Sequence, residues 1–71
     1  MKAINLNKEW EFIGSEMKSF SEKNVPYLIR EVLFAARIML HKYSDTKERK
    51  MKSFYKLIYL KSKKYYLERV H

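Results

Sequence analysis

Few residues in this chain could do metal chemistry. The two histidines, His41 and His71, stand 30 positions apart in the sequence, and there is no cysteine. No HExxH or CxxC motif occurs, and no two histidines have the i, i+4 spacing that places metal ligands on one helix face. The sequence therefore predicts neither a metal site nor a cofactor.

Glutamates near the amino end are the other group with catalytic potential. Two carboxyl groups in one cleft could act as general acid and general base. Glu9 and Glu16, however, stand beside lysines on a predicted amphipathic surface, which is typical of solvated side chains. With a single glycine, the chain cannot form a glycine-rich phosphate loop, and no Ser-His-acid grouping can be assembled. We expect a protein that is not an enzyme.

Positive charge is concentrated toward the carboxyl end. The 71 residues carry a formal net charge of +8. Residues 44–71 hold nine basic and three acidic residues, a net charge of +6, whereas residues 1–25 sum to zero. A field this uneven attracts acidic partners to one surface. Acidic proteins, phosphate backbones and anionic lipids would all respond to it.

One face of the last predicted helix is both basic and apolar on a helical wheel. Protein interfaces combine apolar or aromatic anchors with surrounding charge, so we expect this face to bind an acidic protein partner. In an alternative interpretation, Leu60 and Leu67 pack against the first helix. Self-association through the same face, which would give a homo-oligomer, is a third. The residues of this predicted partner-binding face are Lys52, Lys56, Tyr59, Leu60, Lys63, Leu67 and Val70.

These features favour a small regulatory protein, acting as an adaptor or inhibitor. Cysteine-free chains of this size, rich in Lys, Ile and Tyr, are common among phage and mobile-element products of AT-rich genomes. The usual targets of such products are host polymerases, replication proteins and AAA+ machines. No family motif in the chain supports a more specific assignment.

Nucleic-acid binding without sequence specificity is the main alternative. Lysines bind phosphate as point charges, and tyrosines are present that could stack on bases. No RNP, GxxG or zinc-finger signature occurs. Membrane association through a basic amphipathic helix is less favoured, because a core this small needs the tyrosines and leucines of that helix. The further phosphate-binding residues of the nucleic-acid alternative are Lys47, Arg49, Lys50, Lys61, Lys64 and Arg69.

The elements that position these residues are predicted to be helices. One glycine and one proline in 71 residues favour helix over the turn-rich pattern of a small β domain. We expect one all-α domain over residues 1–71, a small three-helix bundle. Its helices should span about 6–22, 26–43 and 46–68, and the last two should form an antiparallel αα-hairpin. A core of this size contributes only about 3–5 kcal/mol of stability without a partner or oligomer.

The first predicted helix has the clearest apolar periodicity. Asn5 or Asn7 could cap its start. An alternative interpretation is a strand over residues 9–12 followed by a turn at Gly14, but the longer window favours a helix. The stripe that we expect to face the core consists of Leu6, Trp10, Ile13, Met17 and Phe20.

Capping signals mark the other two helices. Asn24 and Pro26 suit the start of the second, which is apolar on most of its circumference and is therefore expected at the centre. Asp45 and Glu48 resemble a capping box for the third. The core-facing stripe that we expect on the third helix is Met51, Phe54, Tyr55, Ile58 and Tyr65.

The chain shows no targeting or membrane-spanning segment. Residues 3–9 lack the apolar stretch of a signal peptide, and the longest apolar run covers only residues 32–36. The absence of cysteine fits a reducing compartment. We therefore expect a cytoplasmic protein.

Overall fold

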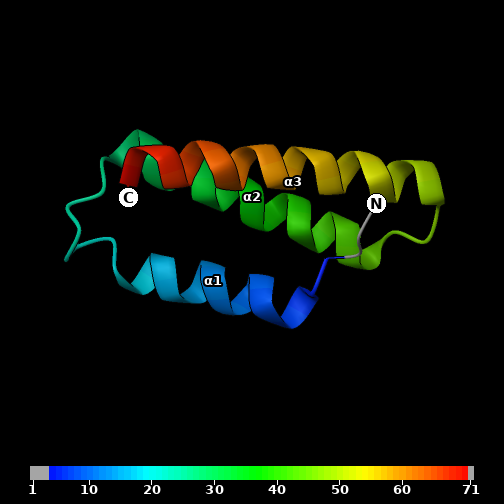
Figure 1. Ribbon diagram of the computed structural model, residues 1–71, viewed down its shortest axis with the longest axis horizontal. Coiled ribbons are helices and arrows are strands. Elements are labelled where there is room, and N and C mark those ends of the chain that lie inside the picture. Colours follow the sequence, from blue (N-terminus) through cyan, green and yellow to red (C-terminus); the bar gives the residue numbers. More distant parts are fainter. Residues whose placement is uncertain (1–3, 71) are drawn as a thin grey trace.

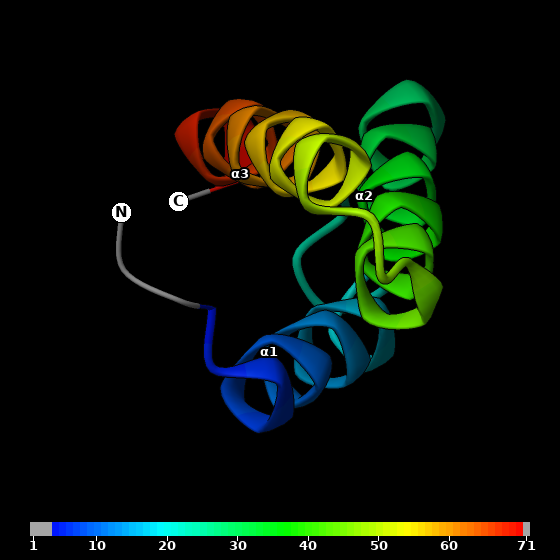
Figure 2. The same cartoon turned by 90° about the vertical axis from the view of Figure 1, so that its right-hand side faces the viewer.

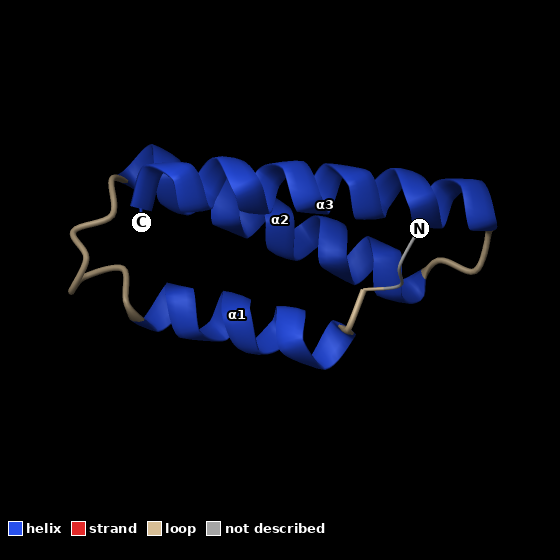
Figure 3. Ribbon diagram, in the orientation of Figure 1, coloured by secondary structure: helices blue, strands red, loops and turns tan. Residues whose placement is uncertain are grey.

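The computed structural model describes residues 4–70, which form three helices and, in that part of the chain, no strand (Figure 3). The helices are α1 (Leu6–Lys18), α2 (Tyr27–Asp45) and α3 (Arg49–Val70). The molecule is elongated, with extents of 38 × 20 × 18 Å. The predicted all-α fold with three helices is confirmed. No helix within residues 4–70 has the length and apolar character to cross a membrane.

The helix α2 packs against both of the other helices. It runs antiparallel to α3 along most of its length, which confirms the predicted αα-hairpin (Figure 1). Seen along the bundle, the three helices form an open triangle, with α3 above α1 and α2 to the right of both (Figure 2). No Cα atom of α1 lies within 8 Å of a Cα atom of α3. Only side chains therefore connect α1 to α3.

The core draws on all three helices. From α2, the side chains of Leu33, Ala36 and Leu40 are completely buried, which confirms the central place predicted for this helix. Ile13 of α1 and Phe20, just after α1, are also buried. The other residues of the predicted α1 stripe are half-buried and pack against the core; they are Leu6, Trp10 and Met17.

The start of α1 follows the sequence signals. Asn5 is the N-cap residue, and its side-chain oxygen accepts a hydrogen bond from the backbone N–H of Lys8 at 3.2 Å. This bond satisfies one of the free N–H groups of the first turn. Residues 9–14 are helical, so the strand alternative is wrong.

Gly14 lies inside α1 with an exposed backbone and open space around the position of a Cβ atom. Replacing Gly14 with alanine should raise the free energy of unfolding by about 1 kcal/mol, because glycine loses more backbone entropy in a helix. Urea denaturation followed by circular dichroism measures this change. A destabilised Gly14→Ala variant would show that the position is crowded or not helical.

The helix α1 ends at Lys18, earlier than the predicted end near residue 22. The hydroxyl of Ser19 donates to the carbonyl of Glu16 at 2.9 Å, a local bond that competes with continued helix. The chain then turns and brings Phe20 into the core.

Asn24 has a role different from the predicted cap of α2. Its φ of 51° is left-handed, a conformation that asparagine tolerates better than most residues. The N–H groups of Asn24 and Val25 donate to the carbonyls of Ser21 and Phe20, at 3.2 and 3.0 Å, which is the bonding pattern of a Schellman motif. Asn24 thus closes the preceding turn. Pro26 is the N-cap residue of α2 and makes no side-chain capping bond.

The cap of α3 is also shifted from its predicted position. Asp45 is the last residue of α2, and α3 begins at Arg49. The carboxylate of Glu48 accepts hydrogen bonds from the N–H groups of Lys50 and Met51, at 3.0 and 2.8 Å. The predicted capping box is therefore wrong: Glu48, directly before the helix, satisfies the free N–H groups.

The side of α3 that faces the core is not the predicted one. Tyr59 and Tyr66 are completely buried, whereas Met51, Phe54 and Tyr65 of the predicted core stripe are exposed. The other two residues of that stripe, Tyr55 and Ile58, are half-buried. The two buried tyrosines face inward because their hydroxyl groups reach carboxylates of α1, so that aromatic surface is buried without losing a hydrogen bond.

Candidate functional site

The inward side of α3 carries a polar connection to α1. The Tyr59 hydroxyl and the Lys63 ammonium both donate to Oε1 of Glu9, at 2.5 and 2.8 Å. About two helical turns further along α3, the Tyr66 hydroxyl donates to Oε1 of Glu16 at 3.0 Å. Because the α1 and α3 backbones stay apart, these long side chains hold the two helices together (Figure 2).

The two glutamates are therefore structural acceptors, and the prediction that they are solvated is wrong. Burial raises the pKa of Glu9, but the hydrogen bonds from Lys63 and Tyr59 and the charge of Lys63 outweigh it, so the pKa lies below its usual value. Glu16 is buried and also pairs with Lys23 at 3.1 Å. As acceptors of these hydrogen bonds, both carboxylates link α1 to α3.

Because of the buried tyrosines, the folded state should lose stability at alkaline pH. Burial, and then the hydrogen bond and charge of the facing carboxylate, raise the pKa of Tyr59 and of Tyr66 above the usual value near 10. A raised pKa in the folded state means that stability is complete below pH 10 and is lost as the pH rises above it. We expect both tyrosines to ionise only on unfolding. A titration at 295 nm should show their absorbance change together with the loss of helical circular dichroism.

Ionisation of all six tyrosines in the helical state would contradict this expectation. A Tyr59→Phe, Tyr66→Phe variant is the control, because without these two hydroxyl groups the absorbance change that accompanies loss of the helix should be smaller.

Much of the predicted partner-binding face lies inside the molecule. Tyr59 is in the core and Lys56 is buried. The ammonium of Lys63 pairs with Glu9 and lies 4.7 Å from the centre of the Phe12 ring. These three residues therefore do not form an exposed face, and the prediction from the helical wheel that they do is wrong.

The other four residues of the predicted partner-binding face differ in their exposure and contacts. Lys52 donates to the carbonyls of Tyr43 and Thr46, at 2.8 and 3.3 Å. Val70 is half-buried against the core. Leu60 and the half-buried Leu67 remain accessible and border a shallow surface depression, whose lining residues are Leu60, Lys63, Lys64, Leu67 and Glu68.

The opposite side of α3, turned away from the core, carries a new combination of apolar and basic side chains. We call it the outer face. Phe54, Leu57 and Leu60 are 53%, 49% and 40% exposed, so each presents a large apolar surface to water. The residues of the outer face follow one another at spacings of four, three, four and three positions, which places them on one side of the helix. The outer face consists of Lys50, Phe54, Leu57, Lys61 and Lys64, with Leu60 at its edge.

The cations proposed to bind phosphate differ in their surroundings. Among residues 4–70, no carboxylate pairs with Lys47, Arg49, Lys50 or Lys61. All four are exposed. The other two cations, Lys64 and Arg69 near the end of α3, contact neighbouring side chains. Lys64 lies 4.0 Å from Glu68, and Arg69 lies over the ring of Tyr65, at 3.3 Å from its centre.

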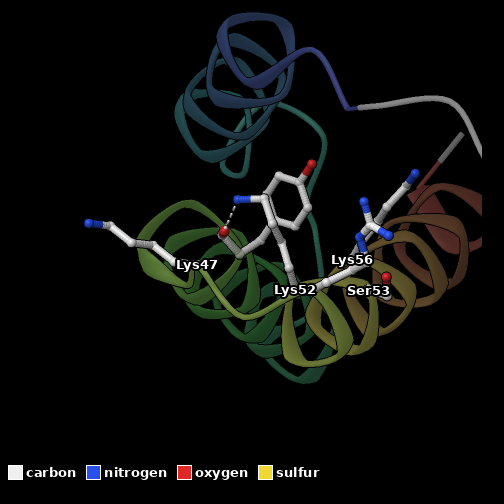
Figure 4. Close-up of a pocket in the computed structure, with 6 residues that line it drawn as sticks. Lys47, Lys52, Ser53 and Lys56 are labelled. Atoms are coloured by element: carbon white, nitrogen blue, oxygen red, sulfur yellow. Dashed lines mark hydrogen bonds between the residues drawn. The ribbon is translucent and has the colours of Figure 1, made fainter.

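A basic pocket lies where α2 turns into α3 (Figure 4). Its lining includes cations that the sequence assigned to two different hypotheses, nucleic-acid binding and partner binding. Ser53 and Tyr43, which the sequence did not single out, complete it. The spacing of Arg49, Lys52 and Lys56, which shares one helix face, is the signal that could have found it. The pocket is lined by Tyr43, Lys47, Arg49, Lys52, Ser53 and Lys56.

No three His, Asp or Glu side chains among the described residues come together as a metal site would require. His41 packs on Trp10, with 4.5 Å between ring centres, and His71 lies outside the described residues. Comparison with known proteins finds no family model that matches the chain, no curated protein related to it and no solved structure similar to it.

Proposed function

We propose that the protein is a small, non-enzymatic regulatory protein, an adaptor or inhibitor, that docks on an acidic surface of a larger protein. The outer face of α3 is the docking surface. The observation that carries this proposal is the exposure of Phe54, Leu57 and Leu60 between lysines that have no strong ion pair within residues 4–70. Apolar anchors surrounded by charge are typical of protein interfaces.

The apolar centre of the outer face favours a protein over a phosphate backbone. Full burial of a Leu or Phe side chain contributes about 1.5–3 kcal/mol, so the exposed halves of Phe54 and Leu57 could each contribute about 1 kcal/mol. A phosphate backbone offers no apolar surface that could remove these side chains from water.

Charge favours a different protein over a second copy of this chain. Two copies that met through their outer faces would bring Lys50, Lys61 and Lys64 of each chain together. Like charges brought together in an interface oppose association. An acidic surface turns the same lysines into attractive contacts and accelerates the encounter.

The test is retention of an acidic protein from nuclease-treated lysate by the wild-type protein, by Leu57→Asp and by Lys18→Gln. Both variants lower the net charge by one, but Lys18 lies on α1, away from the outer face. We expect Lys18→Gln to bind as the wild type does, and Leu57→Asp to bind at least about 30-fold more weakly, as for an interface hot spot. Equal retention by both variants would contradict docking through the outer face.

Nucleic-acid binding is a second candidate, favoured by the four exposed cations that no described carboxylate neutralises. Its signature is salt dependence: the logarithm of the binding constant should fall with the logarithm of salt concentration, with a slope of about 0.9 per phosphate contact. Duplex DNA titrated at several salt concentrations measures this slope. A flat response would exclude this candidate.

A further inference from the structure

We propose that the docking surface for the acidic partner continues from the outer face into a shallow depression between α2 and α3, where the partner inserts an apolar side chain that stands next to one of its carboxylates. This inference rests on the proposed function, because it names what the partner of the outer face presents. We call the site the α2–α3 depression. It is lined by Val32, Lys61, Ser62 and Tyr65.

The α2–α3 depression lies where these two helices pack side by side (Figure 1). Val32 comes from α2 and the other lining residues come from α3, and no residue of α1 lines it. Lys61 belongs both to the depression and to the outer face, and Leu57 of the outer face precedes it by one helical turn. A partner that covers the outer face at Leu57 and Lys61 therefore also lies over the depression.

The apolar part of the depression is accessible and held in place. Tyr65 is 44% exposed, and Val32 is half-buried against the core. The guanidinium of Arg69 lies over the Tyr65 ring, at 3.3 Å from its centre, and donates to the Tyr65 carbonyl at 3.1 Å. This contact restricts the ring before a partner arrives, so less entropy is lost on binding. An apolar side chain in the depression would remove the exposed surfaces of Val32 and Tyr65 from water.

Lys61 gives the depression a positive charge without a counter-charge. It is exposed, and no carboxylate within residues 4–70 forms an ion pair with it. The carboxylates closest in sequence to the lining residues have other contacts: Glu31 accepts from the Tyr27 hydroxyl, and Glu68 lies 4.0 Å from Lys64. Covering an ammonium with apolar surface is costly unless a carboxylate pairs with it. The partner must therefore place a carboxylate beside its apolar side chain.

Two other occupants match only half of this site. A phosphate backbone would pair with Lys61 but offers no apolar group to cover Val32 and Tyr65. The outer face of a second copy would offer apolar groups, but it carries lysines and no acidic residue. The combination of an apolar wall with an uncompensated lysine therefore favours an acidic protein.

The experiment is an NMR titration of the ¹⁵N-labelled protein with small probes, at constant ionic strength and pH 7. Phenylacetate carries an apolar group and a carboxylate, phenylacetamide carries only the apolar group, and acetate carries only the carboxylate. We expect saturable shifts at residues 32 and 61–65 with phenylacetate, and binding about threefold weaker with phenylacetamide and about tenfold weaker with acetate. Equal binding of the three probes, or no saturable shift at these residues, would overturn the proposal.

Two charge variants separate the effect of Lys61 from the net charge of the protein. Lys61→Gln should bind phenylacetate no more tightly than phenylacetamide, because the cation beside the carboxylate is gone. Lys47→Gln lowers the net charge equally and should keep the threefold preference, about that of the wild type. Both lysines are exposed, so neither change should disturb the fold. An unchanged preference in Lys61→Gln would overturn the assignment of a carboxylate to this site.

Filling the depression tests whether the partner uses it. Ser62→Leu adds an apolar side chain at the depression, and Ser15→Leu makes the same change at an exposed position of α1. In the retention assay with nuclease-treated lysate, Ser62→Leu should bind the acidic protein about tenfold more weakly, and Ser15→Leu should bind it as the wild type does. Normal retention by Ser62→Leu, together with loss in Leu57→Asp, would overturn this inference alone, whereas normal retention by both would contradict the proposed function. If Ser62→Leu does not fold, the titration of Lys61→Gln decides.

Discussion

Replacing Tyr66 with alanine is expected to lower the free energy of unfolding by about 3–5 kcal/mol, the range for a fully buried aromatic residue. The Tyr66 ring is completely buried, with ring centres 6.4 Å from both Phe12 and Phe20. Its hydroxyl also donates to Glu16. Since a domain of this size has only about 3–5 kcal/mol of stability in total, most Tyr66→Ala molecules should be unfolded at 25 °C.

The neighbouring tyrosine is the matched control. Tyr65 is 44% exposed, and its ring contacts the guanidinium of Arg69. Tyr65→Ala should cost less than about 1 kcal/mol, as is usual for a partly exposed side chain. Urea denaturation followed by circular dichroism compares the two variants. A larger loss for Tyr65→Ala than for Tyr66→Ala would mean that α3 faces the core with the opposite side.

Replacing Glu16 with alanine is expected to lower the free energy of unfolding by about 2–3 kcal/mol. The change removes the acceptor to which the buried Tyr66 hydroxyl donates and one ion-pair partner of Lys23. An unsatisfied buried donor carries the full cost of its lost hydration. Glu11→Ala, at an exposed position of the same helix, should change stability by less than about 0.5 kcal/mol.

A double-mutant cycle with Tyr66→Phe isolates the contact between these two residues. If the hydroxyl and the carboxylate depend on each other, Glu16→Ala should be less harmful in the Tyr66→Phe background, by about 1 kcal/mol. Additive losses in the double variant would show that Glu16 stabilises the bundle through other contacts.

The first two helices could be predicted from the sequence because their apolar residues select one arrangement. The stripe of α1 follows the 3.6-residue period, and α2 is apolar on so much of its surface that only a central position can bury it. Boundaries were less accurate, because a serine hydroxyl and a left-handed asparagine decide where α1 and its following turn end.

The orientation of α3 could not be predicted in the same way. Large apolar or aromatic side chains occur on several sides of this helix, so hydropathy alone does not identify the side that faces the core. What decides the orientation is a set of carboxylates on another helix. The bond from Lys63 to Glu9 joins residues 54 positions apart, and no local pattern records it.

The wrong orientation predicted for α3 also affected the prediction of the binding surface. The basic and apolar character of α3 was evident in the sequence, and it supports docking on an acidic partner. Which residues present that character depends on the rotation of the helix: Tyr59 and Lys56 turn inward, whereas Phe54 and Leu57 turn outward. The basic pocket needed the structure too, because Tyr43 of α2 forms one wall of it.

The most direct test of docking through the outer face is site-specific photo-crosslinking in nuclease-treated lysate. A photoreactive phenylalanine analogue would replace Leu57 on the outer face or, as the control, Ile38 on α2, which is similarly exposed, at 52% against 49% for Leu57. The proposed function predicts one acidic protein crosslinked from position 57 and little or none from position 38. Crosslinking of that protein from position 38 alone, or equally from both, would contradict it.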